Sequence, residues 1–190
     1  MNKENSIPIT RQIAISGIML AICIASQFFK NLSVYITGPI VNLCLILTVM
    51  MAGLMCGLIL AVITPVTAFI IAASPVMNAV PGIIPLIMLG NAVIVVMTHF
   101  FVKPAVSDDR AIVNVQSVIR AVLSAAAKGA VMGLTISLWL LPTFIPEASP
   151  LRDKLPIFQT TFSVTQFLTA LIGFVYFFIV WTPLSRIQSR

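Results

Sequence analysis

Charged residues are scarce in this sequence, and none occurs between Lys30 and Lys103. Asp and Glu together number 5 of 190 residues, and all charged residues make up 8% of the chain. Soluble domains carry about 25% charged residues, because their surfaces face water on every side. So low a charge content excludes a soluble enzyme, a nucleic-acid-binding domain and a disordered tail. The sequence instead predicts an integral membrane protein.

Residue types that carry chemistry are equally scarce. The single histidine is His99, and the three cysteines lie in apolar segments at no spacing typical of a metal site. A zinc protease needs more than one histidine. A Ser–His protease needs an activated serine on a glycine-bearing turn, and we find no such arrangement with His99. No glycine-rich phosphate loop followed by Lys and Ser or Thr is present. We therefore expect no catalysis, no metal and no cofactor bound by this chain.

Long apolar runs dominate the sequence and predict an all-α bundle of six transmembrane helices, forming a single domain over residues 1–190. The predicted helices lie at about 13–29, 39–51, 54–72, 83–102, 113–141 and 164–184. The second is short for a span of about 20 residues, and it could begin earlier, in the stretch 35–37. The first resembles a signal peptide, with Lys3 and Arg11 before an apolar run. It lacks a small-residue cleavage site, so we expect it to be retained.

The basic residues set the predicted orientation, since cytoplasmic segments are enriched in Lys and Arg. With both termini in the cytoplasm, that side holds Lys3, Arg11, Lys103, Arg110, Arg186 and Arg190. The outer side then holds Lys30, Arg152 and Lys154. We therefore expect a multi-pass protein of the cell membrane with both termini cytoplasmic. The proline-rich stretch 142–161 is predicted to lie outside, as either a lid over a site or a plain linker.

Small residues recur at every fourth position in several predicted helices, a spacing that lets helices pack closely in lipid. The longest row lies on the fifth helix and comprises Ala121, Ala125, Gly129, Gly133 and Ser137. This row predicts that the fifth helix is central in the bundle. The first helix carries Gly17, Ala21 and Ala25 at the same spacing. These three residues serve either packing inside the bundle or, if the helix lies at the edge, docking of a helix from another subunit.

Uncharged polar side chains fall at a similar depth, in the outer half of the predicted membrane, on five helices. Their depths follow from a rise of about 1.5 Å per helical residue. The set comprises Asn42, Thr64, Thr67, Asn91, Thr135 and Gln166, with Asn78 in the adjoining connection. Several prolines interrupt the same region, and the carbonyls they free are tolerated where they line a cavity. The set predicts either a solute pocket or hydrogen bonds between helices alone. Trp139, near the outer interface, is a further candidate for the pocket.

Lys128 is the one charged residue predicted to lie well inside a helix, about 20 Å along from Pro142. A buried ammonium needs an anion, carbonyls or water as a partner, and no carboxylate lies at that depth. Lys128 therefore either contacts a carboxylate or phosphate of a bound solute, or it extends to the inner headgroups or binds freed carbonyls. Its predicted depth agrees poorly with that of the outer polar set.

Four stretches resemble the S component, the substrate-binding membrane subunit, of energy-coupling factor (ECF) transporters for vitamins and related micronutrients. The stretch Ala21-Ile-Cys-Ile-Ala25 matches the AxxxA pattern of that family. The others are the stretches 37–42 (TGPIVN), 63–65 (ITP) and 85–91 (PLIMLGN). Length, six predicted helices and a basic amino terminus extend the resemblance over nearly the whole chain.

The resemblance implies a subunit that binds a vitamin-like solute at the outer face and releases it inside. Its partners would be a transmembrane coupling subunit and two ATPase subunits, and those ATPases, rather than this chain, would use ATP. The resemblance implies docking through Ala21 and Ala25, and a ligand near Asn91, Thr135 and Gln166. It implies no particular vitamin. The alternatives are a structural or assembly subunit that binds no small molecule, and an intramembrane enzyme.

Overall fold

The computed structural model describes residues 8–29, 33–107 and 113–188, and most of these residues are helical. Six helical segments are long and apolar enough to cross a membrane, which confirms the predicted all-α transmembrane bundle. These segments are Ile9–Gln27, Val34–Ala52, Leu54–Ala72, Ile83–Val106, Val115–Phe144 and Leu155–Ser185. The architecture is that of a multi-pass membrane protein.

The first three spans are single helices, and the last three are composite. The single helices are α1 (Ile9–Gln27), α2 (Val34–Ala52) and α3 (Leu54–Ala72), followed by the short α4 (Pro75–Ala79). The composite spans comprise α5 (Ile83–Met97), η1 (Thr98–Val102) and α6 (Lys103–Ser107), then α7 (Val115–Met132), η2 (Gly133–Leu140) and α8 (Leu141–Phe144), then α9 (Leu155–Phe162) and α10 (Val164–Gln188). The segments η1 and η2 are π-helical, a form often found at functional sites.

The second helix begins at Val34, earlier than the predicted residue 39. The Ser33 side chain accepts a hydrogen bond from the backbone N–H of Tyr35 at 3.1 Å. Such a cap satisfies one of the backbone donors that a helix leaves unpaired in its first turn. The additional turn gives α2 the length of a full span.

Half of the proline-rich stretch 142–161 is helical, because α8 covers its first residues and α9 its last. Pro142 and Pro156 stand in the first turns of α8 and α9. In the first turn of α9, proline is tolerated because its missing N–H would have no helical partner in any case. Pro142 lies near the end of the continuous helical span Val115–Phe144, Pro156 lies at the start of α9, and the connection between α8 and α9 comprises residues 145–154.

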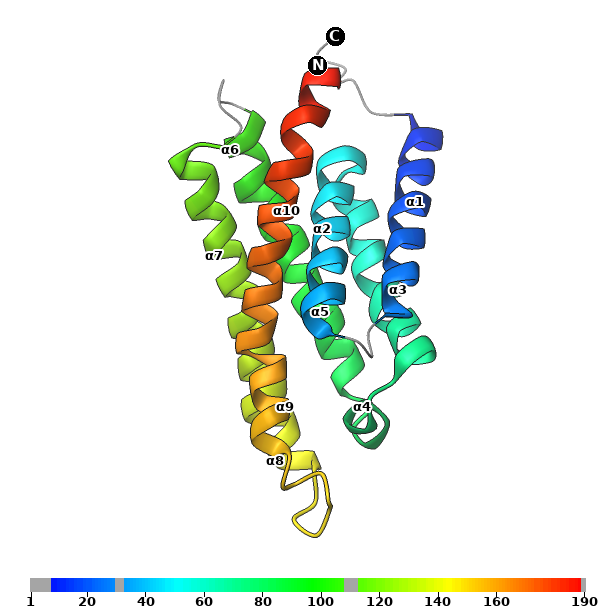
Figure 1. Cartoon of the computed structure of the whole chain (residues 1–190), viewed down its shortest axis with the longest axis vertical. Helices are drawn as coiled ribbons and strands as arrows, with labels where there is room; N and C mark the ends of the chain where they lie inside the picture. Colours follow the sequence, from blue (N-terminus) through cyan, green and yellow to red (C-terminus); the bar gives the residue numbers. More distant parts are fainter. Residues whose placement is uncertain (1–7, 30–32, 108–112, 189–190) are drawn as a thin grey trace.

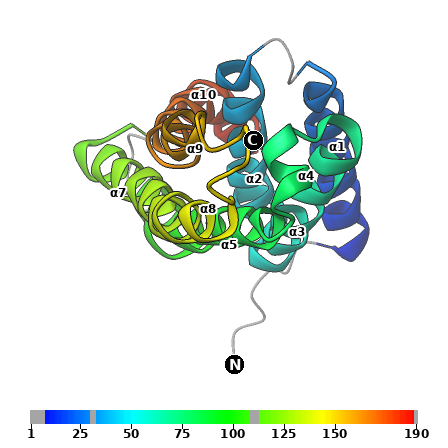
Figure 2. The same cartoon turned by 90° about the horizontal axis from the view of Figure 1, so that it is seen from below.

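Both ends of the described chain lie at the same end of the bundle, where α1 begins and α10 ends (Figure 1). We call this the terminal end, and we call the opposite end, with α4 and the connection between α8 and α9, the loop end. The helix α2 is central and contacts α1, α3, α5 and α10 (Figure 2). The prediction that the fifth span is central is wrong, because α7 packs mainly against α5 and α10 and leaves one face exposed. A small-residue row permits close packing but does not require it on every side.

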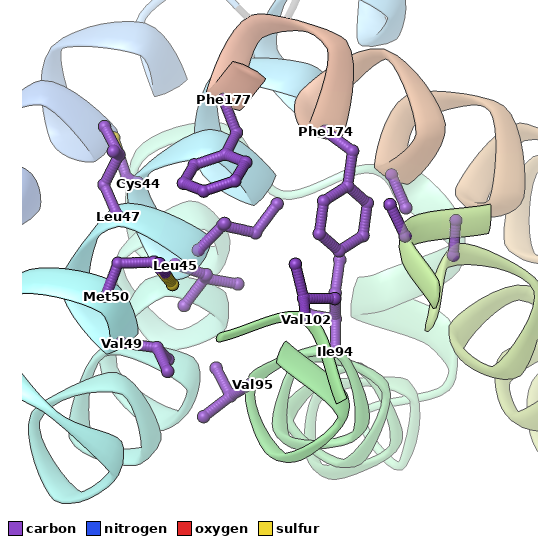
Figure 3. Close-up of a cluster of buried hydrophobic side chains, with 14 of the residues drawn as sticks. Cys44, Leu45, Leu47, Val49, Met50, Ile94, Val95, Val102, Phe174 and Phe177 are labelled. Carbon is purple, nitrogen blue, oxygen red and sulfur yellow. The ribbon is translucent and has the colours of Figure 1, made fainter. Parts of the chain in front are cut away.

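An apolar core fills the terminal half of the bundle. Phe174 and Phe177 of α10 point from one side toward residues of α2 and α5 (Figure 3). Both rings are buried, and that of Phe177 stacks on Trp181 with ring centroids 5.7 Å apart. A second apolar cluster, at the loop end, joins residues of α4, α5, η2, α8 and α9. The polar residues described next lie where α1, α2, α3, α5 and α7 meet.

Candidate functional site

Lys128 is buried in the middle of the bundle, with 2% of its surface exposed. Its Nζ donates hydrogen bonds to Asn42 Oδ1 at 2.6 Å and to Asn91 Oδ1 at 2.8 Å. These contacts join α7 to α2 and α5. Hydrogen bonds from an ammonium are short and strong, because the donor is charged. Two amide oxygens thus supply the partners that a buried ammonium needs.

The prediction that Lys128 lies at a different depth from the outer polar set is wrong, since it contacts two members of that set. The helical path through α7, η2 and α8 covers 30 residues, Val115–Phe144. At about 1.5 Å per residue this path is about 45 Å long, whereas the hydrocarbon core of a bilayer is about 30 Å thick. It extends beyond α2 at the loop end (Figure 1). Pro142 therefore lies outside the membrane boundary, and the depth of Lys128 cannot be measured from it.

Two further helices join this polar network. Asn91 Nδ2 donates to Thr64 Oγ1 at 3.4 Å, and Gln27 Nε2 donates to the Thr64 carbonyl oxygen at 3.0 Å. Gln27 is 3% exposed, and its Oε1 has no hydrogen-bond partner among the described residues. Gln27 of α1 and Thr64 of α3 thereby connect to Asn42, Asn91 and Lys128, and we call these five residues the polar network.

A cavity of about 300 Å³ lies against the polar network, and all five network residues line it. Its remaining walls are mostly apolar and come from α2, α3, α4, α5, α9 and the start of α10. The aromatic part of the wall is Phe158 and Phe162, both on α9. Ligand pockets are typically concave and mostly apolar, with a few polar groups that fix orientation. The arrangement can therefore hold a small solute with one polar end.

Glycines allow the helices that carry the two asparagines to approach their neighbours closely. A Cβ atom added at Gly173 of α10 would lie 2.7 Å from Asn42 Cβ, which is too close for a real contact. A Cβ at Gly90, the residue before Asn91, would collide with the Met132 side chain of α7. These two contacts hold α10 against α2 and α5 against α7, and they fix the positions of Asn42 and Asn91 relative to Lys128.

The structure brings part of the predicted site together. Asn42, Asn91, Lys128 and Gln166 all line the cavity, as does Thr64 of the outer polar set. Segment 142–161 also contributes, because Ile157, Phe158 and Thr161 of α9 are in the cavity wall. This part of the chain is therefore not a plain linker.

Three predicted site residues lie outside the cavity. Thr135 donates through Oγ1 to the Val131 carbonyl of its own helical path at 2.6 Å. Asn78 is exposed on α4. Trp139 is 57% exposed and packs edge-on against Phe144. Thr135 was expected at the site from its depth, Asn78 from the adjoining connection and Trp139 from the outer interface, but none of the three faces the cavity.

Gln27 was not among the predicted site residues. It lies in the last turn of α1. A polar side chain at a helix end is typical of the membrane interface, so its position does not indicate a binding site. Its presence inside the predicted segment 13–29 was the one available signal. The sequence could not show that α1 turns this residue toward α3.

The small residues of α1 lie on the surface of the bundle. Gly17, Ala21 and Ala25 are all exposed, and a Cβ at Gly17 would have no atom within 4 Å. The opposite face of α1 carries the buried Cys23 and Gln27 and packs against α2 and α3. This stripe, which we call the α1 stripe, is therefore not a packing face within the described part of the bundle.

The part of the chain that the structure describes contains no group of three or more His, Cys, Asp or Glu residues that could hold a metal ion. Comparisons of the chain with models of protein families, with curated proteins and with solved structures found no match. The function must therefore be argued from the cavity and the surface of the bundle.

Proposed function

We propose that this chain is the substrate-binding subunit of an ATP-driven importer of the ECF type. It captures a vitamin or related micronutrient at the outer face of the cell membrane, and a transmembrane coupling subunit with two ATPases completes the transport. The cavity beside the polar network is the observation that carries the proposal. A pocket of about 300 Å³ with five buried polar side chains along its wall is what a small-molecule site requires.

The position of the cavity supports uptake from one side. Its walls include α4 and α9 at the loop end, whereas the terminal half is filled by the core around Phe174 and Phe177. The distribution of Lys and Arg favours the cytoplasm for the terminal end. In that orientation the solute enters from the outer face and meets a packed core below it. Release then needs a rearrangement that this chain does not drive alone.

The absence of carboxylates from the predicted spans supports a dependence on partner subunits. Ion-coupled transporters relay protons or sodium through membrane-embedded Asp or Glu. The acidic residues of this chain are Glu4, Asp108, Asp109, Glu147 and Asp153, all outside the predicted helices. Energy from ATP hydrolysis by associated subunits is consistent with this composition.

The α1 stripe supplies a surface for such a partner. Small residues at every fourth position let a second helix approach closely in lipid, where packing rather than hydrophobic burial drives association. The stripe is exposed at the edge of the bundle, next to the large exposed side chains Ile18 and Ile22. A coupling subunit that docks here would contact α1 without covering the α4 and α9 side of the cavity.

Native mass spectrometry of the chain, purified from cells grown with a full complement of micronutrients, tests this proposal. We expect a retained small molecule in the wild-type protein. Ala68→Trp places a large ring in the cavity wall and should abolish retention, because Ala68 lines the cavity. The matched control is Val66→Trp, on the exposed face of the same helix, which should leave retention unchanged.

Two outcomes would contradict the proposal. A wild-type protein that retains no solute and gains none from a micronutrient mixture would favour a structural or assembly subunit. Retention in the well-folded Ala68→Trp variant would place the solute outside this cavity.

A further inference from the structure

We infer that the solute of this cavity is a small monoanion, of the carboxylate class, on a largely apolar body. The inference rests on the proposed function and names the chemical class of its solute. It follows from the orientation of the two asparagine amides and from the charge balance of the cavity, and one unpartnered acceptor indicates in addition a single donor group on the solute.

The orientation of the two amides is determined by Lys128. An ammonium group is a donor only, so Asn42 and Asn91 must both present their oxygen atoms to it. Their Nδ2 groups therefore point away from Lys128. Asn91 Nδ2 donates one bond to Thr64 Oγ1, while the hydrogen bond that the Asn42 side chain makes among the described residues is the one its Oδ1 accepts from Lys128. The asparagines thus offer N–H donors to whatever occupies the cavity.

Lys128 has one further N–H donor. An ammonium has three N–H groups, and two of them are used by the asparagine oxygens. No other acceptor for Nζ occurs among the described residues. One N–H of Lys128, one of Asn91 and two of Asn42 are therefore available. A carboxylate accepts through two oxygens and can satisfy several such donors together.

The charge balance of the cavity favours a single negative charge. Among the described residues that line the cavity, Lys128 is the one that carries a charge, and none of them is Asp or Glu. A buried charge is costly unless an opposite charge compensates it. A monoanion makes the occupied site neutral, whereas a phosphate with two negative charges leaves one uncompensated. A cationic solute would add a second positive charge to the same site.

The rest of the cavity defines the body of the solute. The walls away from the polar network are formed largely by apolar side chains, among them Ala68, Ile87 and Phe158. Gln27 lines the cavity too, and its Oε1 is buried without a partner among the described residues. Its amide cannot be reversed without losing the bond from Nε2 to the Thr64 carbonyl. An N–H or O–H group on the solute would satisfy this acceptor.

Matched pairs of probes test the inference on the full-length protein in lipid nanodiscs. Each pair is a carboxylic acid and its primary amide, which share a shape and differ in charge: indole-3-acetate, 4-phenylbutyrate and octanoate with their amides. We expect at least one acid to bind about tenfold or more tightly than its amide, because charge-assisted hydrogen bonds are the stronger ones. Tryptamine, a cation with an indole body, should not bind measurably.

Asn42→Asp is the decisive variant. The substituted side chain keeps an oxygen acceptor for Lys128, but it adds a negative charge and removes the Nδ2 donor. We expect this variant to fold and to lose the preference for the acid over the amide. Asn78→Asp makes the same change at an exposed position outside the cavity and should keep the preference. Lys128→Arg keeps the positive charge, and this variant should keep part of the preference for the acid over the amide.

The outcomes separate this inference from the proposed function. A retained natural solute that is neutral or cationic would overturn the inference and leave the importer proposal standing. Failure of every acid in the panel to bind more tightly than its amide would overturn the inference as well. An unchanged acid preference in Asn42→Asp would show that the anion lies away from Lys128. Absence of any retained solute would count against the proposed function itself.

Discussion

The two halves of the bundle differ in how their polar side chains bond to neighbouring helices. In the terminal half, the hydroxyls of Thr48 and Ser124 donate to carbonyls of their own helices, both at 2.7 Å. In the loop-end half, the side chains of Gln27, Asn91 and Lys128 bond to other helices. A hydroxyl can bond back to its own helix, so the apolar side chains around it pack without interruption. Longer amide and ammonium groups need partners on neighbouring helices.

This difference explains why one half is filled and the other holds a cavity. Phe174, Phe177 and Leu45 can adapt to one another through packing alone. The polar network fixes five helices at defined positions through directional bonds, and the space beside it is left to a solute. The comparison predicts that substitutions in the terminal half change stability, whereas those in the loop-end half change binding as well.

The largest loss of stability is expected for Phe177→Ala. The ring is fully buried and packs against Phe178 and Trp181. Large-to-small changes of this kind cost about 3–5 kcal/mol, because packing is lost and a void remains. Unfolding by denaturant in mixed micelles would measure the loss. Ile179→Ala, on the exposed face of the same helix, is the control, and an equal effect of the two would show that the terminal half is not close-packed.

Asn91→Ala should reduce both stability and solute binding. The change leaves Lys128 with one amide acceptor and removes a donor from Thr64. A buried group left without its partner costs about 1–3 kcal/mol in the free energy of unfolding. Expression should persist while the affinity for the retained solute falls. Asn78→Ala serves as the exposed control, and an unchanged affinity in Asn91→Ala would remove Asn91 from the site.

Two glycine substitutions should change the stability of the bundle in opposite directions. Gly90→Ala forces a Cβ against the Met132 side chain, and such overpacking costs about 1–3 kcal/mol. Gly17→Ala meets no atom within 4 Å, and it should stabilise α1 by about 0.5–1 kcal/mol because alanine favours a helix. Thermal unfolding of both variants in the same detergent checks the contrast. A loss of stability in Gly17→Ala would mean that the α1 stripe has a partner within the bundle.

The smallest change in stability is expected for Ala21→Trp combined with Ala25→Trp. Both residues are exposed on α1, and surface changes of this kind usually alter the free energy of unfolding by no more than about 0.5 kcal/mol. The retained solute should stay bound, while uptake by cells that express the complete importer should be abolished. Normal uptake would exclude the α1 stripe as the docking surface.

The sequence was sufficient to predict the helices, because an apolar run of membrane length has few alternatives as a structure. It also placed Asn42, Thr64 and Asn91 at one level, since depth follows from position along a helix. It could not place Lys128 at the correct depth, because that depth was taken from the position of Pro142. The helix around Pro142 extends past the membrane, so Pro142 does not mark the membrane surface. The thickness of the bilayer determines how many residues a helix needs to cross it. It does not determine how far each helix continues beyond the membrane surface.

Helix rotation was the second property that the sequence did not contain. Thr135 and Trp139 lie on the correct span and near the correct level, yet they face away from the cavity. Gln27 faces α3 from the end of α1. Such orientations depend on contacts between helices far apart in the chain, as at Gly90 and Met132. No pattern within one helix reports them.

A cryo-electron microscopy or crystal structure of the purified protein with its retained solute tests the central claim most directly. The account predicts solute density in the cavity between α3, α5 and α9, with an anionic group within hydrogen-bond distance of Lys128 Nζ. A bundle in which side chains fill this space, with the amides of Asn42 and Asn91 satisfied by protein groups alone, would contradict it.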